Sequence, residues 1–354
     1  MSKVLAVEIG FGSCSLCGGI KDGKPEVLTF PSIVAQVDNR TDMSAGLTKR
    51  DTVTVAVDGS FYEVGPEAHL ATGKTTTRIL NNHYIDSPQY KALFFGSLAM
   101  AKMPVVDLLV LGVPVSSLHR VEELKSMAVG IHQIGDKKVE VKAAWVIVQP
   151  LGGLLSYADQ IGQAGYAELR EINTLSVDCG YGTLDFLVSR GLKINESRSS
   201  AVESGMGVLI NEIWERSLKA AFPRADKMPT EVIDQAFWKT PGVLRISGRK
   251  YSFPKCDGKD RDGNDVGVRF DAKTTIDSFT QAAMTAVKNI AGTGTDIDQI
   301  ILFGGPAHTY LAALQIAYPD HTIHVLQNHL TAVCEGMYLG GLQYVKQLAA
   351  KSAA

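Results

Sequence analysis

Apolar segments of strand length alternate with apolar stripes of helical spacing along most of the chain. Continuous apolar runs at residues 105–115, 144–148 and 300–303 predict buried strands, because strands that are covered on both faces are hydrophobic at nearly every position. Helical spacing predicts helices at residues 88–102, 121–129, 153–164, 207–221, 274–291 and 330–345. Strands and helices that alternate in this way predict an α/β architecture.

Local signals predict several helix boundaries. Ser87 followed by Pro88 is typical of an N-cap and the first residue of a helix. Thr274, with Asp277 three residues later, resembles a capping box, and Gly292 predicts the end of the helix that this pair would open.

Two further segments predict short strands. Asp58-Gly59 lies between the strand-like residues 52–57 and 60–64 and is a strong signal for a tight hairpin. Residues 242–269 are polar and rich in turn formers, so we expect two irregular strands there with an exposed loop.

One short pattern occurs twice, about half the chain apart. Residues 7–13 and 177–183 match in residue type at every position except the third: apolar, acidic, any residue, Gly, aromatic, Gly, hydroxyl. Each copy follows a β-rich run and precedes another apolar segment, which predicts a strand, a glycine turn and a returning strand. The spacing of the copies predicts two similarly built domains.

These turns are suited to phosphate. Glycine lets backbone N–H groups approach phosphate oxygens, because no Cβ blocks them, and the closing hydroxyl can add a donor. An acid beside phosphate requires a cation between the two, so Glu8 and Asp178 predict Mg²⁺, held in part through its water shell. Two purely structural hairpins are the alternative. The residues expected at the phosphates are Gly10, Phe11, Gly12, Ser13, Gly180, Tyr181, Gly182 and Thr183.

Two other glycine turns precede predicted helices. Gly304, Gly305, Pro306 and Ala307 follow an apolar strand, and such a turn lets a flat ring lie against the backbone at a helix N-terminus. Gly205 lies in a similar turn at residues 204–207. An ordinary strand–helix turn explains either segment equally well.

Composition and charge narrow the function classes. The net charge of −2 gives no whole-chain basic field for nucleic acid or anionic lipid. The chain has no run of 18 apolar residues, so no transmembrane helix is expected, and no amphipathic terminal helix with aromatic anchors predicts another membrane attachment. Five cysteines without a secretion signal favour reduced thiols in the cytoplasm. Cys14 and Cys17 are spaced for a redox or metal role, but buried free thiols are the commoner case.

At these motifs the chain resembles the actin, sugar-kinase and DnaK-chaperone ATPase superfamily and, within it, the ParM/StbA-type plasmid-segregation actins. Residues 175–185 resemble the second phosphate motif closely, and residues 7–13 resemble the first. Residues 300–307 are similar to the adenosine motif. Further similarities lie in the two interdomain connecting segments and in one strand, at residues 148–153, 335–338 and 109–115.

The resemblance implies an actin-like fold of two duplicated α/β domains with a nucleotide cleft between them. The expected domains are residues 1–164, completed by the C-terminal helix 329–354, and residues 165–328. The implied cofactors are ATP or GTP and Mg²⁺. Asp178 would hold the hydrated Mg²⁺ and polarise the attacking water, and Gln149 would orient that water.

Three positions depart from the family pattern. Glu8 and Ser15 stand where the first motif usually has Asp and a phosphate-binding Lys, and Gln149 stands where many ParM-like proteins have Glu. A glutamine cannot act as a general base, but positioning the water is enough for phosphoryl transfer. The missing lysine removes a positive charge from the phosphates, so weaker nucleotide binding or slower turnover is expected.

The function implied by the resemblance is an ATPase that polymerises into nucleotide-dependent filaments for plasmid DNA segregation. Its expected partners are other copies of itself and a DNA-binding adaptor with a centromere-like DNA site, without direct nucleic-acid binding. A small-molecule kinase of the same superfamily is the alternative. A kinase would need an acid to deprotonate a substrate hydroxyl, and Asp185 is the sole spare candidate, although it also reads as a strand-end residue that makes backbone contacts.

Overall fold

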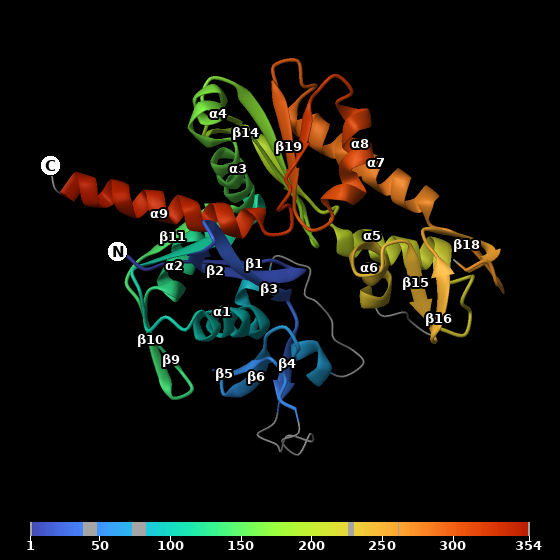
Figure 1. The fold of residues 1–354 in the computed structure, drawn as a ribbon, viewed down its shortest axis with the longest axis horizontal. Coiled ribbons are helices and arrows are strands. Elements are labelled where there is room, and N and C mark those ends of the chain that lie inside the picture. The colour runs from blue at the N-terminus through green and yellow to red at the C-terminus, as the bar shows by residue number, and fades with distance from the viewer. Residues whose placement is uncertain (1, 38–47, 73–82, 226–229, 261, 353–354) are drawn as a thin grey trace.

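A computed structural model describes residues 2–37, 48–72, 83–225, 230–260 and 262–352, which form two lobes, each built on a five-stranded sheet (Figure 1). The first sheet has the order β11-β8-β1-β2-β3, and the second has the order β14-β13-β12-β19-β20. The strands of the first are β1 Val4–Ile9, β2 Ser13–Lys21, β3 Lys24–Pro31, β8 Leu108–Val113 and β11 Ala144–Val148. Those of the second are β12 Asn173–Cys179, β13 Leu184–Arg190, β14 Lys193–Val202, β19 Gln299–Phe303 and β20 Ile323–Val325.

The two sheets have the same topology. In the first, β1 pairs antiparallel with β2 and parallel with β8, and β8 pairs parallel with β11. In the second, β12 pairs antiparallel with β13 and parallel with β19, and β19 pairs parallel with β20. The repeated sequence pattern therefore lies in the same hairpin of both sheets, and the predicted α/β fold with duplicated domains is confirmed.

Helices cover both faces of each sheet. The helices are α1 Pro88–Ala101, α2 Val121–Ala128, α3 Gln149–Gln160, α4 Gly162–Leu169, α5 Met206–Ile213, α6 Thr230–Trp238, α7 Lys273–Ala291, α8 Ala307–Ala317 and α9 Ala332–Ser352. One core joins the first sheet to α1 and α2, and another joins the second sheet to α7 and α8. A third core joins the remaining faces of both sheets to α3 and α9, so these two helices lie between the sheets. None of the helices in the described ranges could cross a membrane.

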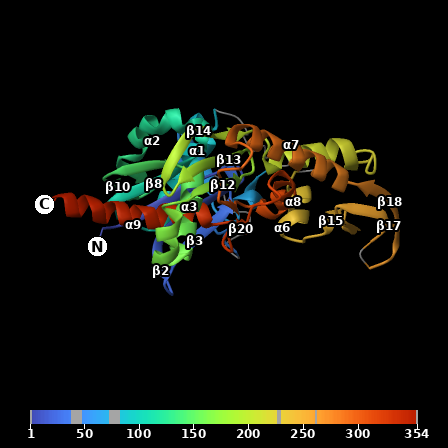
Figure 2. The ribbon, with the colours of Figure 1, turned by 90° about the horizontal axis from the view of Figure 1, so that it is seen from above.

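Smaller elements extend the lobes. The first lobe carries the sheets β4-β6-β5 and β7-β10-β9, and the second carries the hairpins β15-β16 and β17-β18. Figures 1 and 2 place these two hairpins and the C-terminal end of α9 at opposite ends of the molecule. The strands are β4 Val34–Val37, β5 Val53–Val57, β6 Ser60–Val64, β7 Val105–Val106, β9 Gly130–Ile134, β10 Lys137–Val141, β15 Val243–Ile246, β16 Arg249–Ser252, β17 Lys255–Lys259 and β18 Asp265–Asp271. Short 3₁₀ turns occupy Ala68–Ala71, Tyr84–Asp86 and Val115–Arg120, and a π-helical turn occupies Trp214–Leu218.

Several local predictions need correction. Residues 242–269 form four strands rather than two, because alternate side chains such as Leu244, Tyr251 and Phe270 are buried in a core with α5 and α6. The apolar run 105–115 contains two strands, and α6 was not predicted. The capping box at Thr274 is wrong: the N-cap residue of α7 is Ala272, and the Asp271 Oδ1, one residue earlier, accepts a hydrogen bond from the Lys273 N–H at 2.9 Å.

Other local predictions are confirmed. The Ser87 Oγ accepts a hydrogen bond from the Tyr90 N–H at 3.1 Å, and Pro88 opens α1. Asp58-Gly59 joins β5 to β6, and Gly292, at φ 95°, ends α7.

Helix α3 begins at Gln149, one turn before the predicted start, and crosses α9 at backbone contact. A Cβ on Gly336 would lie 1.8 Å from the Gly152 carbonyl oxygen, and one on Gly153 would lie 2.1 Å from the Phe303 ring. Glycine is therefore required where the two helices and the second sheet meet. This crossing fixes the position of Gln149 at the start of α3.

Candidate nucleotide site

The two repeated turns lie face to face and interlock. A Cβ on Gly12 would lie 2.6 Å from the Tyr181 Cβ, and a Cβ on Gly182 would lie 2.4 Å from the Phe11 ring. The aromatic residue of each turn thus packs on the glycine of the other. Phe11 also stacks on Tyr84, with ring centroids 4.9 Å apart. The predicted turns from the two lobes are brought together at one place.

Matching hydrogen bonds close both turns. The Gly10 N–H donates to the Ser13 carbonyl at 3.0 Å, and the Gly180 N–H donates to the Thr183 carbonyl at 2.9 Å. The sequence repeat is therefore also a repeat of backbone geometry.

Residues outside the first turn donate hydrogen bonds to its carbonyl groups. The Ser32 N–H donates to the Gly12 carbonyl at 3.0 Å, and the Ser32 hydroxyl donates to the Gly10 carbonyl at 2.6 Å. The Tyr84 hydroxyl donates to the same Gly10 carbonyl at 3.2 Å. Ser32 and Tyr84 were not predicted as site residues, because an isolated Ser or Tyr carries no sequence signal for such a role.

The start of α5 supports the second turn in the same way. The N–H groups of Gly205, Met206 and Gly207 donate to the carbonyls of Gly182, Gly180 and Tyr181 at 3.2, 3.1 and 2.7 Å. A Cβ on Gly205 would lie 2.4 Å from the Gly182 carbonyl carbon. Gly205 therefore packs against the second turn, with its N–H on the Gly182 carbonyl, and its predicted contact with the nucleotide stays a prediction.

The carbonyl groups of the two turns accept these hydrogen bonds, whereas several N–H groups of the turns remain available to a ligand. Within the described ranges, the N–H groups of Phe11, Gly12 and Gly182 donate to no backbone carbonyl. Clustered N–H groups in a turn form a concave site for anions. A cavity of about 30 Å³ lies beside them, lined in part by Phe11, Tyr84 and Thr183.

The carboxyl groups of Glu8 and Asp185 lie close enough to Asp178 for their charges to act on it. Burial raises the pKa of Glu8 to about 7 and that of Asp185 to about 6. The pKa of Asp178 is raised well above its usual range, mainly by burial and further by the charges of Glu8 and Asp185. No Lys, Arg or His of the described residues contributes to these shifts. Carboxylate oxygens without a protein counter-charge fit a hydrated Mg²⁺, which would restore their charged form.

Gln149 lies directly beside this group. It is the first residue of α3, its side chain is buried, and its Nε2 donates to the Glu8 Oε1 at 3.3 Å. The two predicted polar residues of the first lobe are therefore in contact.

The third glycine turn lies against the end of β12. Gly304 has a φ of 93°, and a Cβ there would lie 2.2 Å from the Cys179 carbonyl oxygen and 2.7 Å from the Asp178 Oδ1. The Gly304 N–H donates to the His329 carbonyl at 2.8 Å. Gly305 is exposed, Pro306 caps α8, and Ala307 is buried as its first residue.

Each carboxylate oxygen of Asp185 accepts a hydrogen bond. Its Oδ1 accepts from the Val115 N–H at 2.6 Å, and its Oδ2 accepts from the Thr183 hydroxyl at 2.5 Å. Both oxygens therefore have structural partners, as expected for a strand-end residue that makes backbone contacts.

Cys14 and Cys17 lie in different hydrophobic cores. Cys14 packs in the core with α1, where its Sγ lies 3.3 Å from the Ser97 Oγ, whereas Cys17 packs in the core on the opposite face of the sheet. Burial raises the pKa of both thiols to about 12. Within the described part of the chain, no cluster of three His, Cys, Asp or Glu side chains is placed to hold a metal.

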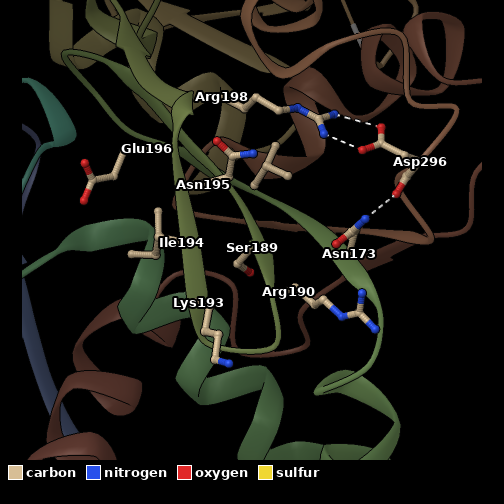
Figure 3. A pocket seen from close by; sticks show the side chains of 10 residues that line it. Asn173, Ser189, Arg190, Lys193, Ile194, Asn195, Glu196, Arg198 and Asp296 are labelled. Carbon is tan, nitrogen blue, oxygen red and sulfur yellow. Dashed lines mark hydrogen bonds and ion pairs between the residues drawn. The ribbon is translucent and has the colours of Figure 1, made fainter.

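A cavity of about 520 Å³ lies away from these turns, at the other end of the second sheet (Figure 3). Arg198 donates to both carboxylate oxygens of Asp296, at 2.5 and 3.0 Å, and the Asn173 Nδ2 donates to the Asp296 carbonyl at 2.8 Å. These polar groups satisfy one another, and none of the predicted site residues lines this cavity.

Comparisons with known proteins agree with this geometry. Residues 6–152 match the family of N-terminal domains of actin-like proteins. The structure of Ta0583, an archaeal actin homolog, superposes with a TM-score of 0.72 at 15% identity, covering 96% of this chain and 99% of that one. A ParM filament subunit from Clostridium botulinum gives 0.73 at 16% identity, covering 97% and 100%.

The chain has the actin-like fold. The resemblance to ParM and related actin-like proteins that the sequence motifs indicate is therefore confirmed. An ADP complex of the archaeal homolog also superposes, with a TM-score of 0.71 at 14% identity over 96% of this chain and 99% of that one. No curated protein matches this sequence.

Proposed function

We propose that this actin-like chain binds ATP or GTP with Mg²⁺, polymerises into filaments and hydrolyses the nucleotide. The observation that carries the proposal is the interlocked pair of glycine turns, which offers N–H groups from both lobes to one ligand. Structures with this fold include a ParM filament and an ADP complex, which supports assembly and nucleotide binding respectively.

Each predicted site residue has a proposed role in binding or hydrolysis. The turns at residues 10–13 and 180–183 would bind the β- and γ-phosphates, and Gly304, Gly305, Pro306 and Ala307 would receive the adenosine. Glu8 and Asp178 would hold Mg²⁺, which neutralises phosphate charge when bound. Asp178 would also polarise the attacking water, and Gln149 would orient it. The contact between Gln149 and Glu8 supports this arrangement, because it fixes the amide next to the proposed metal ligands.

The proposed domains are residues 1–164 with 329–354, and residues 165–328. The packing of α9 on β1 and β8 supports assigning that helix to the first domain. The helices α3 and α9 then connect the domains, so a nucleotide held by both turns would fix the angle between them.

Plasmid DNA segregation is the proposed role. It follows from the resemblance to the ParM/StbA type and is supported by the ParM filament among the similar structures. Because the net charge is −2, we propose that DNA is reached through an adaptor protein that binds a centromere-like site, rather than directly.

The alternative hypothesis, a small-molecule kinase, is less well supported. Its candidate base is Asp185, whose two carboxylate oxygens accept hydrogen bonds from the Val115 N–H and the Thr183 hydroxyl. A general base must reach the proton that it removes, and this carboxylate is occupied and buried.

Pelleting and light scattering test the filament directly. We expect assembly with ATP·Mg²⁺ or GTP·Mg²⁺ and none with EDTA, because nucleotide and metal together span the two lobes. Monomers at every protein concentration with both nucleotides would overturn the filament proposal and favour the kinase.

Two substitutions separate hydrolysis from assembly. Asp178→Ala, and less strongly Gln149→Ala, should slow phosphate release by about a hundred- to a thousand-fold, while backbone N–H groups still support nucleotide-driven assembly. The exposed Glu196→Gln is the matched control and should hydrolyse at the parental rate. If either variant releases phosphate at the parental rate, that residue has no part in hydrolysis.

A further inference from the structure

Polar side chains form a row across the second sheet, at the end remote from the glycine turns. Asn173 on β12 lies opposite Arg190 on β13, and Arg190 lies opposite Lys193 on β14. Directly opposite residues share one face of a sheet, with Cβ atoms about 5 Å apart. Two residues further along these strands, Val188 lies opposite Asn195, so this pair shares the face as well. All five residues line the cavity of about 520 Å³ (Figure 3).

The two cations of this row lie opposite each other without a buried counter-charge. Like charges at opposite positions repel and destabilise a strand pair. Within the described ranges, the Lys193 ammonium has no hydrogen bond or ion pair, and the Arg190 guanidinium contacts only the exposed Glu171 carboxylate, at 3.4 Å. Exposed ion pairs of this kind contribute little to stability. The Glu196 side chain points away from both cations (Figure 3), so an anion between them would relieve their repulsion.

The acceptor groups on the facing wall of the cavity are already occupied. Arg198 donates to the Ala291 carbonyl, at the end of α7, and to both carboxylate oxygens of Asp296. The Asn195 Oδ1 accepts a hydrogen bond from the Ser197 hydroxyl at 2.8 Å, which leaves the Asn195 Nδ2 as a donor. The groups that remain available in the cavity are therefore donors and positive charges.

Charge and size indicate the ligand. Pockets for small molecules typically have volumes of about 300–1,000 Å³, and this cavity lies in that range. A phosphate monoester carries a charge of about −1.5 to −2 at pH 7 and so balances two cations, whereas a carboxylate balances one. A guanidinium and an ammonium both bind phosphate oxygens. We propose that Arg190, Lys193 and Asn195 bind the phosphate group of a small phosphate monoester, whose apolar part lies against Val188.

This site is separate from the proposed nucleotide site. Strand β12 runs from Asn173, at the cavity, to Cys179, at the second glycine turn. At about 3.3 Å per residue, the strand places about 20 Å between the two sites. The proposal therefore does not depend on nucleotide binding.

Isothermal titration calorimetry of the nucleotide-free protein with phenyl phosphate tests the site. Benzoate is the comparison with a single charge, and we expect it to bind about tenfold or more weakly, because one cation then stays unbalanced. Inorganic phosphate lacks the ring that would contact Val188 and should also bind more weakly than phenyl phosphate. Saturating ADP·Mg²⁺ should leave the affinity for phenyl phosphate unchanged, because the two sites are separate.

Substitutions in the row make the test specific. Lys193→Gln and Arg190→Gln should each weaken the binding of phenyl phosphate by about tenfold or more, because each removes a charge-assisted hydrogen bond. Lys193→Arg keeps the charge and should retain most of the affinity. Lys24→Gln, at an exposed position of β3 in the first lobe, is the matched control and should bind like the parent. Lys193 and Arg190 are exposed, so these variants are expected to fold.

Four results would overturn the proposal. The first is no binding of phenyl phosphate at millimolar concentration. The second is parental affinity in both Lys193→Gln and Arg190→Gln, which would place the ligand elsewhere. The third is displacement of phenyl phosphate by ADP·Mg²⁺, which would place it between the glycine turns. The fourth is equal affinity for phenyl phosphate and for benzoate or inorganic phosphate, which would contradict the assignment to a phosphate monoester.

Discussion

Glu8→Gln should flatten the pH dependence of folding stability in the nucleotide-free protein. Burial raises the pKa of Glu8 from the ordinary 4.5 to about 7. Between these values the folded chain retains a proton that the unfolded chain has released, so rising pH favours unfolding. Each pKa unit corresponds to about 1.4 kcal/mol, so Glu8 alone lowers the free energy of unfolding by about 3 kcal/mol between pH 4.5 and 7.

The coupling to Asp178 adds to this effect. The charge of Glu8 is one of the causes that raise the pKa of Asp178, so its removal also lowers the second shift. Glu8→Gln keeps the side chain's size and polarity while removing the titrating group. The variant should therefore lose about 2–3 kcal/mol less stability than the parent as the pH rises from 5 to 8.

Urea unfolding at pH 5 and pH 8 measures the difference. The exposed Glu196→Gln is the matched control and should follow the parental pH profile. If Glu8→Gln and the parent lose the same stability between pH 5 and pH 8, Glu8 does not titrate from a buried site, and the reasoning fails. Mg²⁺ with nucleotide should reverse the parental trend above pH 7, because metal binding requires the unprotonated carboxylate.

Two glycine substitutions test the packing around the site. Gly182→Ala places a Cβ 2.4 Å from the Phe11 ring, so it should weaken nucleotide binding and cost about 1–3 kcal/mol in urea unfolding; Gly19→Ala, which meets nothing within 4 Å, should change neither. Gly336→Ala places a Cβ 1.8 Å from the Gly152 carbonyl and should lower the thermal midpoint strongly; an unchanged midpoint would contradict the backbone contact between α3 and α9.

Sequence reasoning succeeded where the signal is local. The repeated turns, the Ser87 cap and the Asp58-Gly59 hairpin each depend on a few adjacent residues, and each is found as predicted. The start of α3 was placed four residues late. Gly152 and Gly153 disfavour a helix by propensity, but their contacts with Val333 and Phe303 override that preference.

The supports behind the turns could not be predicted. Ser32 and Tyr84 reach the first turn from distant positions in the chain, and their hydrogen bonds exist only after β3 and α1 have packed. The four short strands between residues 243 and 271 were also undercounted. Their buried positions alternate with polar ones over only four to seven residues, too few to distinguish a strand from a turn-rich loop.

The aromatic residue in each repeated turn acquires a physical reason only in the structure. In the proposed phosphate site, backbone N–H groups rather than the rings of Phe11 and Tyr181 would bind the ligand, yet both copies of the pattern carry an aromatic ring at this position. Each ring packs on the glycine of the opposite turn, so the spacing between the lobes depends on both contacts at once. A phosphate bound to N–H groups of both turns must be compatible with that spacing. The pattern that predicts phosphate binding therefore also links ligand binding to the relative position of the lobes.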